Sequence, residues 1–440
     1  MKKNAEQIVK ALQAKGFEAY FAGGSVRDLL LGQDPKDIDI ATNANPDQIQ
    51  EVFPDNIALG RQFGVILVKS GGNNFEVATF REEGVYLDKR RPSEVRFSSA
   101  KADALRRDFT VNGLFYDPIK GKIIDYVSGQ EDIKKRVIRF IGDAQARVSE
   151  DHLRLIRAIR FKITLNFQYA NGTFEVIRAN SGLVKNVSAE RIRDELNKIL
   201  LSDRRHIGFT ELTESGIFGH IIPEIPKMKG VPQPIEYHHE GDVYTHIYLA
   251  LKSLAKEAPL HLIWAVILHD IAKPNTLIRE NGRIIFHNHA EVSAELSREI
   301  LKRLKFSSLE IKTISYLVEN HMKIAQTDKM RPNKRLQFLL DPRFPDLISL
   351  CEADSKGTYP INLDLVEKLK SEVEKAKKER EEFQNTKIVK KLFTGDDLIT
   401  LGFTPGPKFK EILEEVNDQV ISGKIKNKAE AKKFIESRFK

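Results

Sequence analysis

Two glycines between an apolar run and a helical stretch constrain the N-terminal part of this chain most strongly. The apolar run 17–22 leads into Gly23-Gly24, and a helical stretch, 26–31, follows them. A short β-prone run then carries Asp37 and Asp39. Residues two apart on a strand point to the same face, so we expect both carboxylates on one side of a sheet. This order predicts a strand, a tight turn and a helix beside a second strand that presents two acids.

The same segment has the chemistry of a phosphate and metal site. The backbone amides of two glycines are open to a triphosphate, and Arg27 adds a fixed positive charge. Two carboxylates on one face hold Mg²⁺ ions, and paired ions activate an attacking hydroxyl and stabilise a leaving pyrophosphate. Glu76, on the β-prone stretch 75–80, is a candidate third carboxylate. The alternative for Glu76 is an exposed strand acid without a ligand.

The bulk composition limits the class of protein. A chain of 440 residues exceeds what one hydrophobic core supports, so we expect two to four domains. The formal net charge of +9 favours a polyanionic partner. The single cysteine, Cys351, excludes internal disulfides and suits a reducing cytoplasm. We expect neither a signal peptide nor a membrane span, because the N-terminus is polar and the longest apolar run, 262–268, is short.

The pattern along the chain predicts an α+β protein with four regions. Residues 1–145 alternate helical and β-prone stretches, as in a head with a mixed β-sheet flanked by helices. Residues 146–225 are expected to form a helical neck and body, with a helix opening at Ser149. Prolines between 223 and 234 mark a linker, and a helical region follows at 236–385. In the tail, 386–440, the glycine-rich turn before a helix near Phe409 is a candidate contact for RNA backbone.

Polar residues downstream of the aspartate pair complete a candidate nucleotide site. Arg106 and Arg107 can neutralise phosphates, while Asp108 and Asn112 can meet ribose hydroxyls. The alternative is a surface salt-bridge cluster. Asp151 and Arg154 stand three apart, which predicts neighbours on one helix face. A carboxylate accepts from the exocyclic amine of cytosine or adenine, and a guanidinium donates to the ring atoms beside it. The pair can therefore read a base edge without a template, and the alternative is an ordinary intrahelical ion pair.

These motifs together resemble the class II tRNA nucleotidyltransferases, which comprise the CCA-adding enzymes and their poly(A) polymerase relatives. The resemblance covers roughly residues 18–225, and its motifs are specific in combination and in order. They are Gly23-Gly24-Ser25-Val26-Arg27-Asp28 to Gly32, Asp37-x-Asp39, Arg106-Arg107-Asp108-Phe109, Glu150-Asp151-x-x-Arg154 and Glu190 to Leu196. The resemblance implies a palm-like catalytic head followed by a neck, a body and a tail. It also implies that cytidines and adenosine from CTP and ATP are added to the 3′ end of tRNA.

The resemblance assigns roles to individual residues. The implied metal-binding and catalytic residues are Asp37 and Asp39, which would hold Mg²⁺, with Glu76 as the third carboxylate. The implied nucleotide-binding residues are Gly23, Gly24, Ser25, Arg27, Arg106, Asp108, Asn112, Asp151 and Arg154. A family loop needed for adding A corresponds to 81–100, which argues against an enzyme that adds only CC. An A-adding enzyme, a poly(A) polymerase and a non-catalytic RNA-binding protein remain as alternatives.

Histidines and aspartates between 236 and 360 form a second constellation. They are His246, His269, Asp270, His289, His321 and Asp354. Imidazole and carboxylate ligands suit Mn²⁺, Fe²⁺, Ni²⁺ or Zn²⁺, so the ligand types alone do not name the metal. The alternative is a set of unrelated core histidines.

This stretch resembles an HD-type phosphohydrolase domain. The resemblance implies that His246, His269, Asp270 and Asp354 bind a metal, with His289 and His321 at positions seen in sites that hold two. It also places Lys273 beside the His-Asp pair, where it could contact a phosphate. Such domains cleave phosphate esters through a metal-bound water.

Overall fold

The computed structural model describes residues 1–60, 64–83, 95–236, 238–385, 392–421, 424–425 and 427–439. The chain divides into two compact units, 1–223 and 224–440, and each is described here by itself. The boundary lies at Pro223 and Glu224, where the proline-rich stretch begins.

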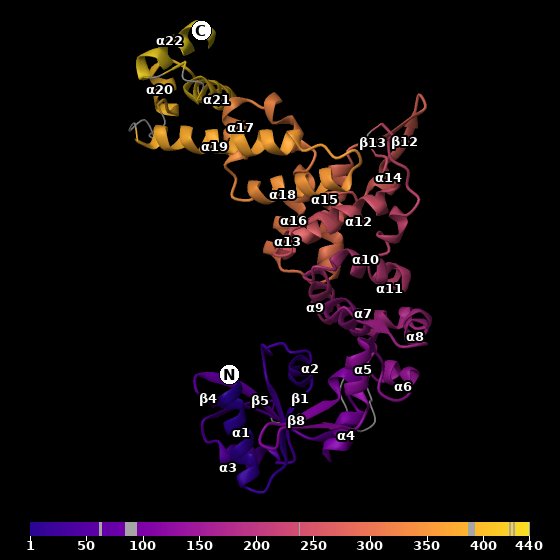
Figure 1. The fold of residues 1–440 in the computed structure, drawn as a ribbon. Helices are drawn as coiled ribbons and strands as arrows, with labels where there is room; N and C mark the ends of the chain where they lie inside the picture. Colours follow the sequence, from indigo (N-terminus) through magenta and orange to yellow (C-terminus); the bar gives the residue numbers. More distant parts are fainter. Residues whose placement is uncertain are drawn as a thin grey trace. The chain divides into compact units, whose positions relative to one another are not determined.

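A seven-stranded mixed sheet forms the core of the first unit (Figure 1). In spatial order its strands are β3 (Asn56–Gly60), β4 (Val65–Ser70), β5 (Asn73–Thr79), β2 (Asp39–Thr42), β1 (Ala19–Ala22), β8 (Leu114–Asp117) and β9 (Lys122–Asp125). Strand β2 runs parallel to β5 and antiparallel to β1. Strand β2 therefore lies between β1 and β5. The glycine turn follows β1, and β2 and β5 carry acids, so these features lie side by side. The mixed sheet and the α+β class confirm the expectation from the sequence.

Short helices pack around this sheet. They are α1 (Lys2–Ala14), α2 (Gly24–Leu30), α3 (Pro46–Val52), α4 (Ala100–Leu105), η2 (Thr110–Asn112) and α5 (Gly129–Lys135). Helix α1 buries Ile8, Val9 and Leu12, and it packs against both α3 and the sheet (Figure 1). Helix α3 starts at a capping box in which Asn45 and Gln48 satisfy each other's backbone amides.

The remainder of the first unit is mainly helical. Its helices are α6 (Ala144–Glu150), α7 (Arg154–Leu165), α8 (Thr173–Ala179), η3 (Ser181–Asn186), α9 (Ala189–Leu200), α10 (Arg205–Glu214) and α11 (Ile217–Ile221). Two short strands, β10 (Val137–Ile138) before α7 and β11 (Gln168–Tyr169) after it, form a parallel pair. Helix α7 buries Ile156, Ile159 and Ile163, as the helical spacing predicted.

Two sequence-based expectations about local structure need correction. Ser149 does not open a helix: α6 begins after Asp143, whose side chain accepts from the Ala146 amide, and Ser149 lies in its last turn. The stretch 81–100 forms two short paired strands, β6 (Arg81–Glu83) and β7 (Val95–Phe97). The polar segment between them, on which the proposed role of this loop depends, lies outside the described residues.

The second unit is built from helices and one hairpin (Figure 1). Its elements up to the tail are η4 (Pro226–Met228), α12 (Val243–Ser253), α13 (Leu260–Leu268), α14 (Lys273–Thr276), β12 (Leu277–Glu280), β13 (Arg283–Phe286), α15 (His289–Arg303), α16 (Ser308–Asn320), η5 (Lys323–Lys329), α17 (Pro332–Leu339), α18 (Phe344–Gly357) and α19 (Asp364–Asn385). Helix α13 is buried from Leu262 to Leu268 and forms the centre of this core. The hairpin β12–β13 interrupts a region that the sequence predicted as helical throughout.

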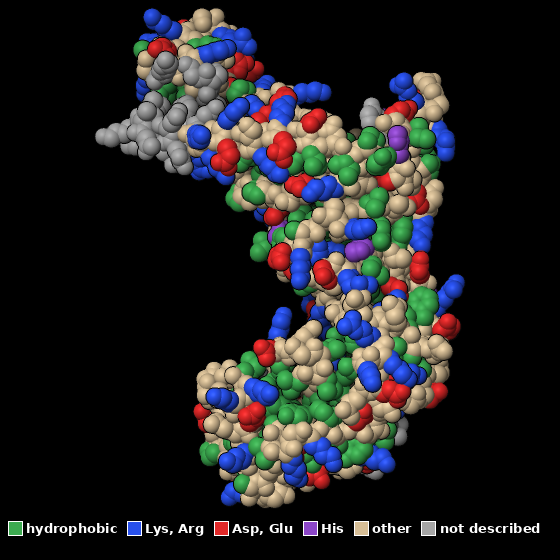
Figure 2. Space-filling view, viewed as in Figure 1, with side chains coloured by type: hydrophobic (Ala, Val, Ile, Leu, Met, Phe, Trp, Pro, Cys, Tyr) green, Lys and Arg blue, Asp and Glu red, His purple; other side chains and the backbone are tan. Residues whose placement is uncertain are grey.

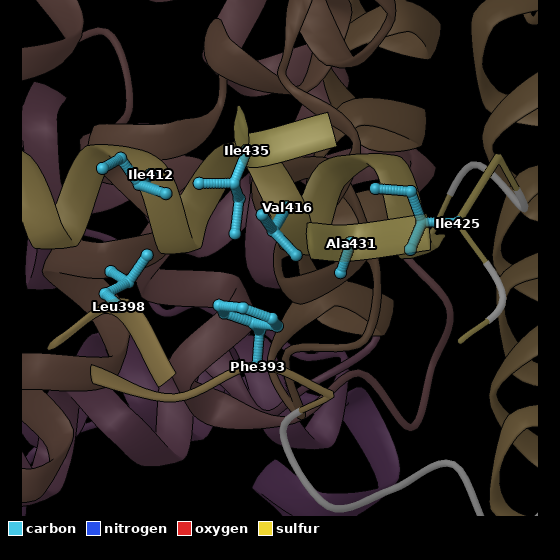
Figure 3. Packing of buried hydrophobic residues seen from close by; sticks show 7 residues of the cluster. All are labelled: Phe393, Leu398, Ile412, Val416, Ile425, Ala431 and Ile435. Atoms are coloured by element: carbon cyan, nitrogen blue, oxygen red, sulfur yellow. The ribbon is translucent and has the colours of Figure 1, made fainter. Parts of the chain in front are cut away.

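The last helices have a small hydrophobic core of their own (Figure 3). They are α20 (Gly395–Thr400), α21 (Pro407–Ile421) and α22 (Lys428–Phe439). Figure 3 shows the side chains of Phe393, Leu398, Val416 and Ile435 turned toward one another between these helices.

Basic and acidic side chains are interspersed on the face shown in Figure 2. The formal charge of +9 therefore does not gather into one basic field on that face. Within the described part of the chain, no helix combines the length and the apolar character that crossing a membrane requires.

Candidate active site

Three acids lie near one another where β2 begins beside the middle of β5. Ile40 of β2 pairs with Val77 of β5, so Asp39 and Glu76 are adjacent in the parallel register and share a face. Asp37 lies in the bend just before β2 and not on the strand, which corrects the expectation that both aspartates are strand residues. Desolvation raises the pKa of Asp39, and so do the charges of Glu76 and Asp37, whereas Arg107 lowers it. Mutually repelling carboxylates of this kind suit a divalent cation.

The glycine turn lies directly beside these acids. Asp39 pairs with Ala22, the last residue of β1, and Gly23 follows with a φ of 69° and a ψ of −130°. A side chain at Gly23 would be strained in this conformation, and its Cβ would lie 2.8 Å from Arg107 Nη1. The hydroxyl of Ser25 is buried and donates to the Ala22 carbonyl at 2.9 Å. Its hydroxyl therefore closes the turn, and the implied contact of Ser25 with a triphosphate stays a prediction.

An open pocket of about 710 Å³ extends from the glycine turn over the start of α7. The predicted residues that line it are Gly23, Gly24, Arg27, Asp37, Asp39, Arg106, Asp108, Asn112, Asp151 and Arg154. Seven basic and four acidic side chains line this pocket, so its charge favours an anionic ligand. Ser25 and Glu76 do not contribute to its wall.

A continuous chain of hydrogen bonds fixes the polar wall of the pocket. Arg27 binds Asp28 at 2.7 Å and donates to Asn112 Oδ1 at 2.6 Å. The Asn112 amide donates to Asp108 Oδ1 at 3.2 Å, and Arg157 donates to Asp108 Oδ2 at 2.8 Å. Burial opposes the charge of Asp108, but the Arg157 guanidinium outweighs it and lowers the pKa of this carboxyl. Asp108 is therefore an ionised acceptor at neutral pH.

Asp151 and Arg154 occupy a junction between two helices and do not pair with each other. Asp151 is the extended residue that ends α6, and Arg154 is the first residue of α7. Asp151 binds Arg191 at 2.7 Å, while Arg154 binds Glu150 at 2.5 Å. The prediction of a pair on one helix face is therefore wrong, because the chain leaves the helix at Asp151. Both side chains nevertheless reach the same pocket, which is what a base-reading role requires.

Sequence reasoning left several pocket residues without a site role. They are Arg157, Arg160, Phe161 and Lys198. Arg157 and Arg160 follow Arg154 at intervals of three residues on α7, and this helical spacing is the signal that would have found them. The Phe161 ring lies 3.9 Å from the Arg160 guanidinium carbon and 5.4 Å from that of Arg157.

In the second unit, helix ends bring the six predicted metal ligands together. His269 and His321 follow the last residues of α13 and α16, and His289 is the first residue of α15. His246 comes from α12 and Asp354 from α18. Residues more than a hundred positions apart in the sequence thus meet at one centre.

The six ligands form two groups that share Asp270. In the first group, His246 Nε2 lies 3.0 Å from Asp354 Oδ1 and 3.4 Å from His269 Nε2. In the second, Asp270 Oδ1 lies 3.4 Å from His289 Nε2, and the Nε2 atoms of His289 and His321 are 3.2 Å apart. Asp270 Oδ2 lies 3.3 Å from His269 Nε2, so the two oxygens of Asp270 face different groups.

The protonation pattern of the imidazoles tests whether a metal fits. The Nδ1 atoms of His269, His289 and His321 lie 2.9, 3.2 and 2.6 Å from backbone carbonyl oxygens. A carbonyl only accepts, so each Nδ1 carries a proton and the Nε2 atom of each ring faces the centre, where it can offer a lone pair to a metal ion. Asp270 Oδ1 is buried without a hydrogen-bond partner in the described structure. Lone pairs and an unsatisfied carboxylate oxygen that converge in this way fit a divalent metal ion.

Charges inside this centre shift its pKa values strongly. Burial opposes the charge of His269, but Asp270 and Asp354 outweigh it and raise the pKa of His269 to about 10. Burial and the neighbouring His269 charge lower the pKa of His321 to about 3. Lys273 and His269 outweigh burial and hold the pKa of Asp270 well below its usual value. Lys273 Nζ lies 2.7 Å from Asp270 Oδ2, so its observed partner is a ligand carboxylate.

A pocket of about 620 Å³ opens onto this centre. Its lining includes Asp270, His289, His321 and Asp354, and strand β13 contributes Ile284, Ile285 and Phe286. A phosphate ester of moderate size therefore has access to the candidate metal ligands.

Three family models match the chain in the order of its regions. Residues 19–139 match the poly A polymerase head domain, residues 166–228 match the probable RNA and SrmB-binding site of polymerase A, and residues 237–355 match the HD domain. Fold and site together define a nucleotidyltransferase-type head and a separate HD-type unit.

Sequence relatives indicate the family within this class. The CCA-adding enzyme of Geobacillus thermodenitrificans is 38% identical over 291 residues, which cover 63% of this chain and 68% of that enzyme. The CCA-adding enzyme of Lactococcus lactis subsp. cremoris is 44% identical over 215 residues, and the match spans about half of its length (53%) and 48% of this chain. The CCA-adding enzyme of Staphylococcus haemolyticus is 29% identical over 99% of this chain and 98% of its own.

Solved structures agree with these relatives. The Bacillus stearothermophilus CCA-adding enzyme, solved in complex with CTP, matches with a TM-score of 0.74 and 25% identity, covering 99% of this chain and 98% of that one. The Thermotoga maritima CCA-adding enzyme, solved with tRNA, shares the fold with a TM-score of 0.62 and 20% identity, over 99% of this chain and 94% of its own. The chain belongs to the CCA-adding enzyme family.

Proposed function

We propose that this chain adds C, C and A to the 3′ end of tRNA, with CTP and ATP as nucleotide donors. The observation that carries this proposal is the convergence of Asp37, Asp39 and the glycine turn on one basic pocket. The solved relatives with CTP and with tRNA support the same substrates. A buried, unpaired Cys351 is compatible with the reducing cytoplasm in which we place the reaction.

In this proposal the carboxylates Asp37, Asp39 and Glu76 hold two Mg²⁺ ions. Such ions activate the attacking 3′-hydroxyl and stabilise the leaving pyrophosphate. Arg27 and the glycine turn bind the triphosphate, since Gly23 and Gly24 line the pocket and Arg27 is fixed by Asp28 and Asn112.

Selection of the base is assigned to the helix junction. Asp151 presents an acceptor that matches the exocyclic amine of cytosine and adenine, and UTP and GTP offer a carbonyl there instead. Arg154 is held by the backbone carbonyls of Arg147 at 2.9 Å and Arg106 at 3.0 Å, so its guanidinium is pre-organised. A rigid donor beside a fixed acceptor reads a base edge without a nucleic-acid template.

The test supplies tRNAs that lack CCA, CA or only A, each with the four nucleotides separately. We expect two CMP additions and then one AMP addition, without UMP or GMP. Addition of AMP to a CC end without any CMP incorporation would indicate an A-adding enzyme instead. Long AMP tracts would indicate a poly(A) polymerase, and RNA binding without incorporation would indicate a non-catalytic protein.

We propose hydrolysis of phosphate esters as a second activity of the HD-type unit. The observation that favours it is the pair of ligand groups that share Asp270 beneath an accessible pocket. Imidazole-rich ligands favour Ni²⁺, Mn²⁺, Fe²⁺ or Zn²⁺ over Mg²⁺. A bound metal would supply an activated water, while Lys273 would orient Asp270 through its 2.7 Å contact.

This activity is tested on 2′,3′-cyclic phosphates and simple phosphomonoesters with Ni²⁺, Mn²⁺ or Mg²⁺. We expect His269→Ala to abolish the hydrolysis while nucleotide incorporation persists, since the head does not use this residue. Loss of both activities in a folded variant would show that the HD-type unit also shapes the tRNA site.

A further inference from the structure

His246 differs from the other three imidazoles of the HD-type centre. The other three direct Nδ1 at a backbone carbonyl oxygen, at 2.6 to 3.2 Å. The Nδ1 atom of His246 is buried and makes no hydrogen bond among the described residues. Its nearest charged neighbour is Glu240 Oε1, at 3.4 Å. The ring that lies closest to Asp354 is thus the one whose outer nitrogen faces a carboxylate.

Glu240 is itself held in a fixed position. Its side chain is 1% exposed, and Oε1 lies 2.6 Å from His238 Nδ1. Oε2 accepts the Tyr359 backbone amide at 2.9 Å, and Gln233 Nε2 donates to Oε1 at 3.3 Å. Three different stretches of the chain therefore converge on one carboxylate. Burying a carboxylate costs free energy. Its hydrogen-bond partners offset this cost only while they stay in place together.

The same network reaches the other side of the centre. Gln233 Oε1 accepts from Lys273 Nζ at 2.7 Å, and Lys273 also contacts Asp270 Oδ2 at 2.7 Å. The network surrounds the first ligand group, which is His246, His269 and Asp354. In the described structure, Glu240 contacts neither His289 nor His321, and it is connected to Asp270 only through Gln233 and Lys273, so its direct contact is with the first group.

We propose that Glu240 is a positioning residue of the HD-type centre, which orients His246 through Nδ1 for metal binding at the first ligand group. A carboxylate at Nδ1 fixes the neutral ring with its lone pair on Nε2, and it increases the basicity of that nitrogen. The inference rests on the proposed metal-dependent activity of this unit, and it adds a residue that sequence motifs did not indicate. Because His246 is the one of the six ligands that Glu240 contacts directly in the described structure, its loss should affect one bound ion and spare the other.

The experiment measures metal affinity in the full chain. Mn²⁺ is titrated into the protein and the free ion is followed by electron paramagnetic resonance. Every protein in the series, including the reference called wild type below, also carries Asp39→Asn, so that the acids of the head do not compete for the ion. Glu240→Gln is the main variant, because its amide oxygen still accepts from the Tyr359 amide. Glu240→Ala removes the group completely.

Two control variants are compared with the Glu240 variants. Glu280→Gln makes the same chemical change at an exposed residue of strand β12, which belongs neither to the lining of this pocket nor to the candidate metal ligands. His321→Ala removes a ligand of the second group and should weaken the other ion. The thermal midpoint of each metal-free variant separates a general loss of stability from a local effect.

We expect two Mn²⁺ ions per wild-type chain. Glu240→Gln should bind one of them about 10- to 100-fold more weakly and Glu240→Ala at least as weakly, with the second ion unchanged. Equal affinity for both ions in wild type and Glu240→Gln would overturn the inference, and so would equal weakening of both ions. Absence of any binding to the unmodified site would instead refute the proposed metal centre itself, which is a different outcome.

Discussion

The buried pair between Asp108 and Arg157 offers the sharpest test of how the nucleotide pocket is held together. Asp108 is 9% exposed, and Arg157 donates to its Oδ2 from Nε at 2.8 Å and lies 2.6 Å away through Nη2. Asp108→Asn keeps the shape of the side chain but removes the charge. Arg157 would then keep Glu195, at 3.7 Å, and the more weakly interacting Asp151 as acidic neighbours.

The expected loss follows from these contacts. Breaking a buried ion pair by removing one partner costs 3–5 kcal/mol when the remaining charge is fully buried. Arg157 is 30% exposed and keeps Glu195, so we expect the lower end, about 3 kcal/mol. For a unit of this size, that loss corresponds to a fall in the thermal midpoint of roughly 6–12 °C. In a double-mutant cycle that combines Asp108→Asn with Arg157→Gln, the coupling energy between the two residues should be about 2 kcal/mol.

The chain contains an internal control for this measurement. Its single tryptophan, Trp264, is fully buried in the second unit, so tryptophan fluorescence follows that unit. Far-UV circular dichroism reports both units. Asp108→Asn should lower the midpoint temperature of the first unit's transition, which is seen by circular dichroism. The midpoint temperature of the fluorescence transition should not change. A coupling energy below about 0.5 kcal/mol would refute the reasoning, as would a fluorescence transition that shifts by the same amount.

The effect should also depend on pH in a defined direction. The folded-state pKa of Asp108 lies below the unfolded value of 3.8. Its contribution is therefore complete above that value and is lost as the pH falls through the lower folded-state pKa. The stability difference between wild type and Asp108→Asn should be constant from pH 7 to about 5 and should shrink below about pH 4.

Three further outcomes are expected. Asp39→Asn should reduce nucleotide incorporation by a factor on the order of 10³ without unfolding the chain, measured by single-turnover CMP addition; near wild-type turnover would place the catalytic centre elsewhere. Asp151→Ala should relax the preference for CTP and ATP over UTP and GTP, measured as ratios of kcat/KM, and unchanged ratios would leave Asp151 a structural partner of Arg191. Gly23→Ala should raise the KM for CTP and lower stability by about 1–3 kcal/mol, because the turn has a positive φ and Arg107 Nη1 lies where the Cβ would be; wild-type values for both would refute the steric argument.

The sequence alone determined the order of local elements and the residue types of both sites. The apolar run before Gly23-Gly24 became β1, and the spacing of Ile156, Ile159 and Ile163 became the buried face of α7. These features depend on neighbours within a few positions, so periodicity and turn chemistry are sufficient to predict them. The ligand residues of the HD-type unit were found because histidines and aspartates in a specific order are rarely accidental.

Tertiary structure alone decided which of these residues face each other. Asp151 leaves the helix to bind Arg191, 40 positions away, and Ser25 turns its hydroxyl to the backbone of its own turn. Glu240 meets Tyr359 across 119 positions, and no local pattern carries that information. Ion pairs and buried hydrogen bonds depend on packing between distant segments, because burial decides which polar groups must be satisfied. The sequence thus named the chemistry of the two sites, and the packing of distant elements determined the partners that orient it.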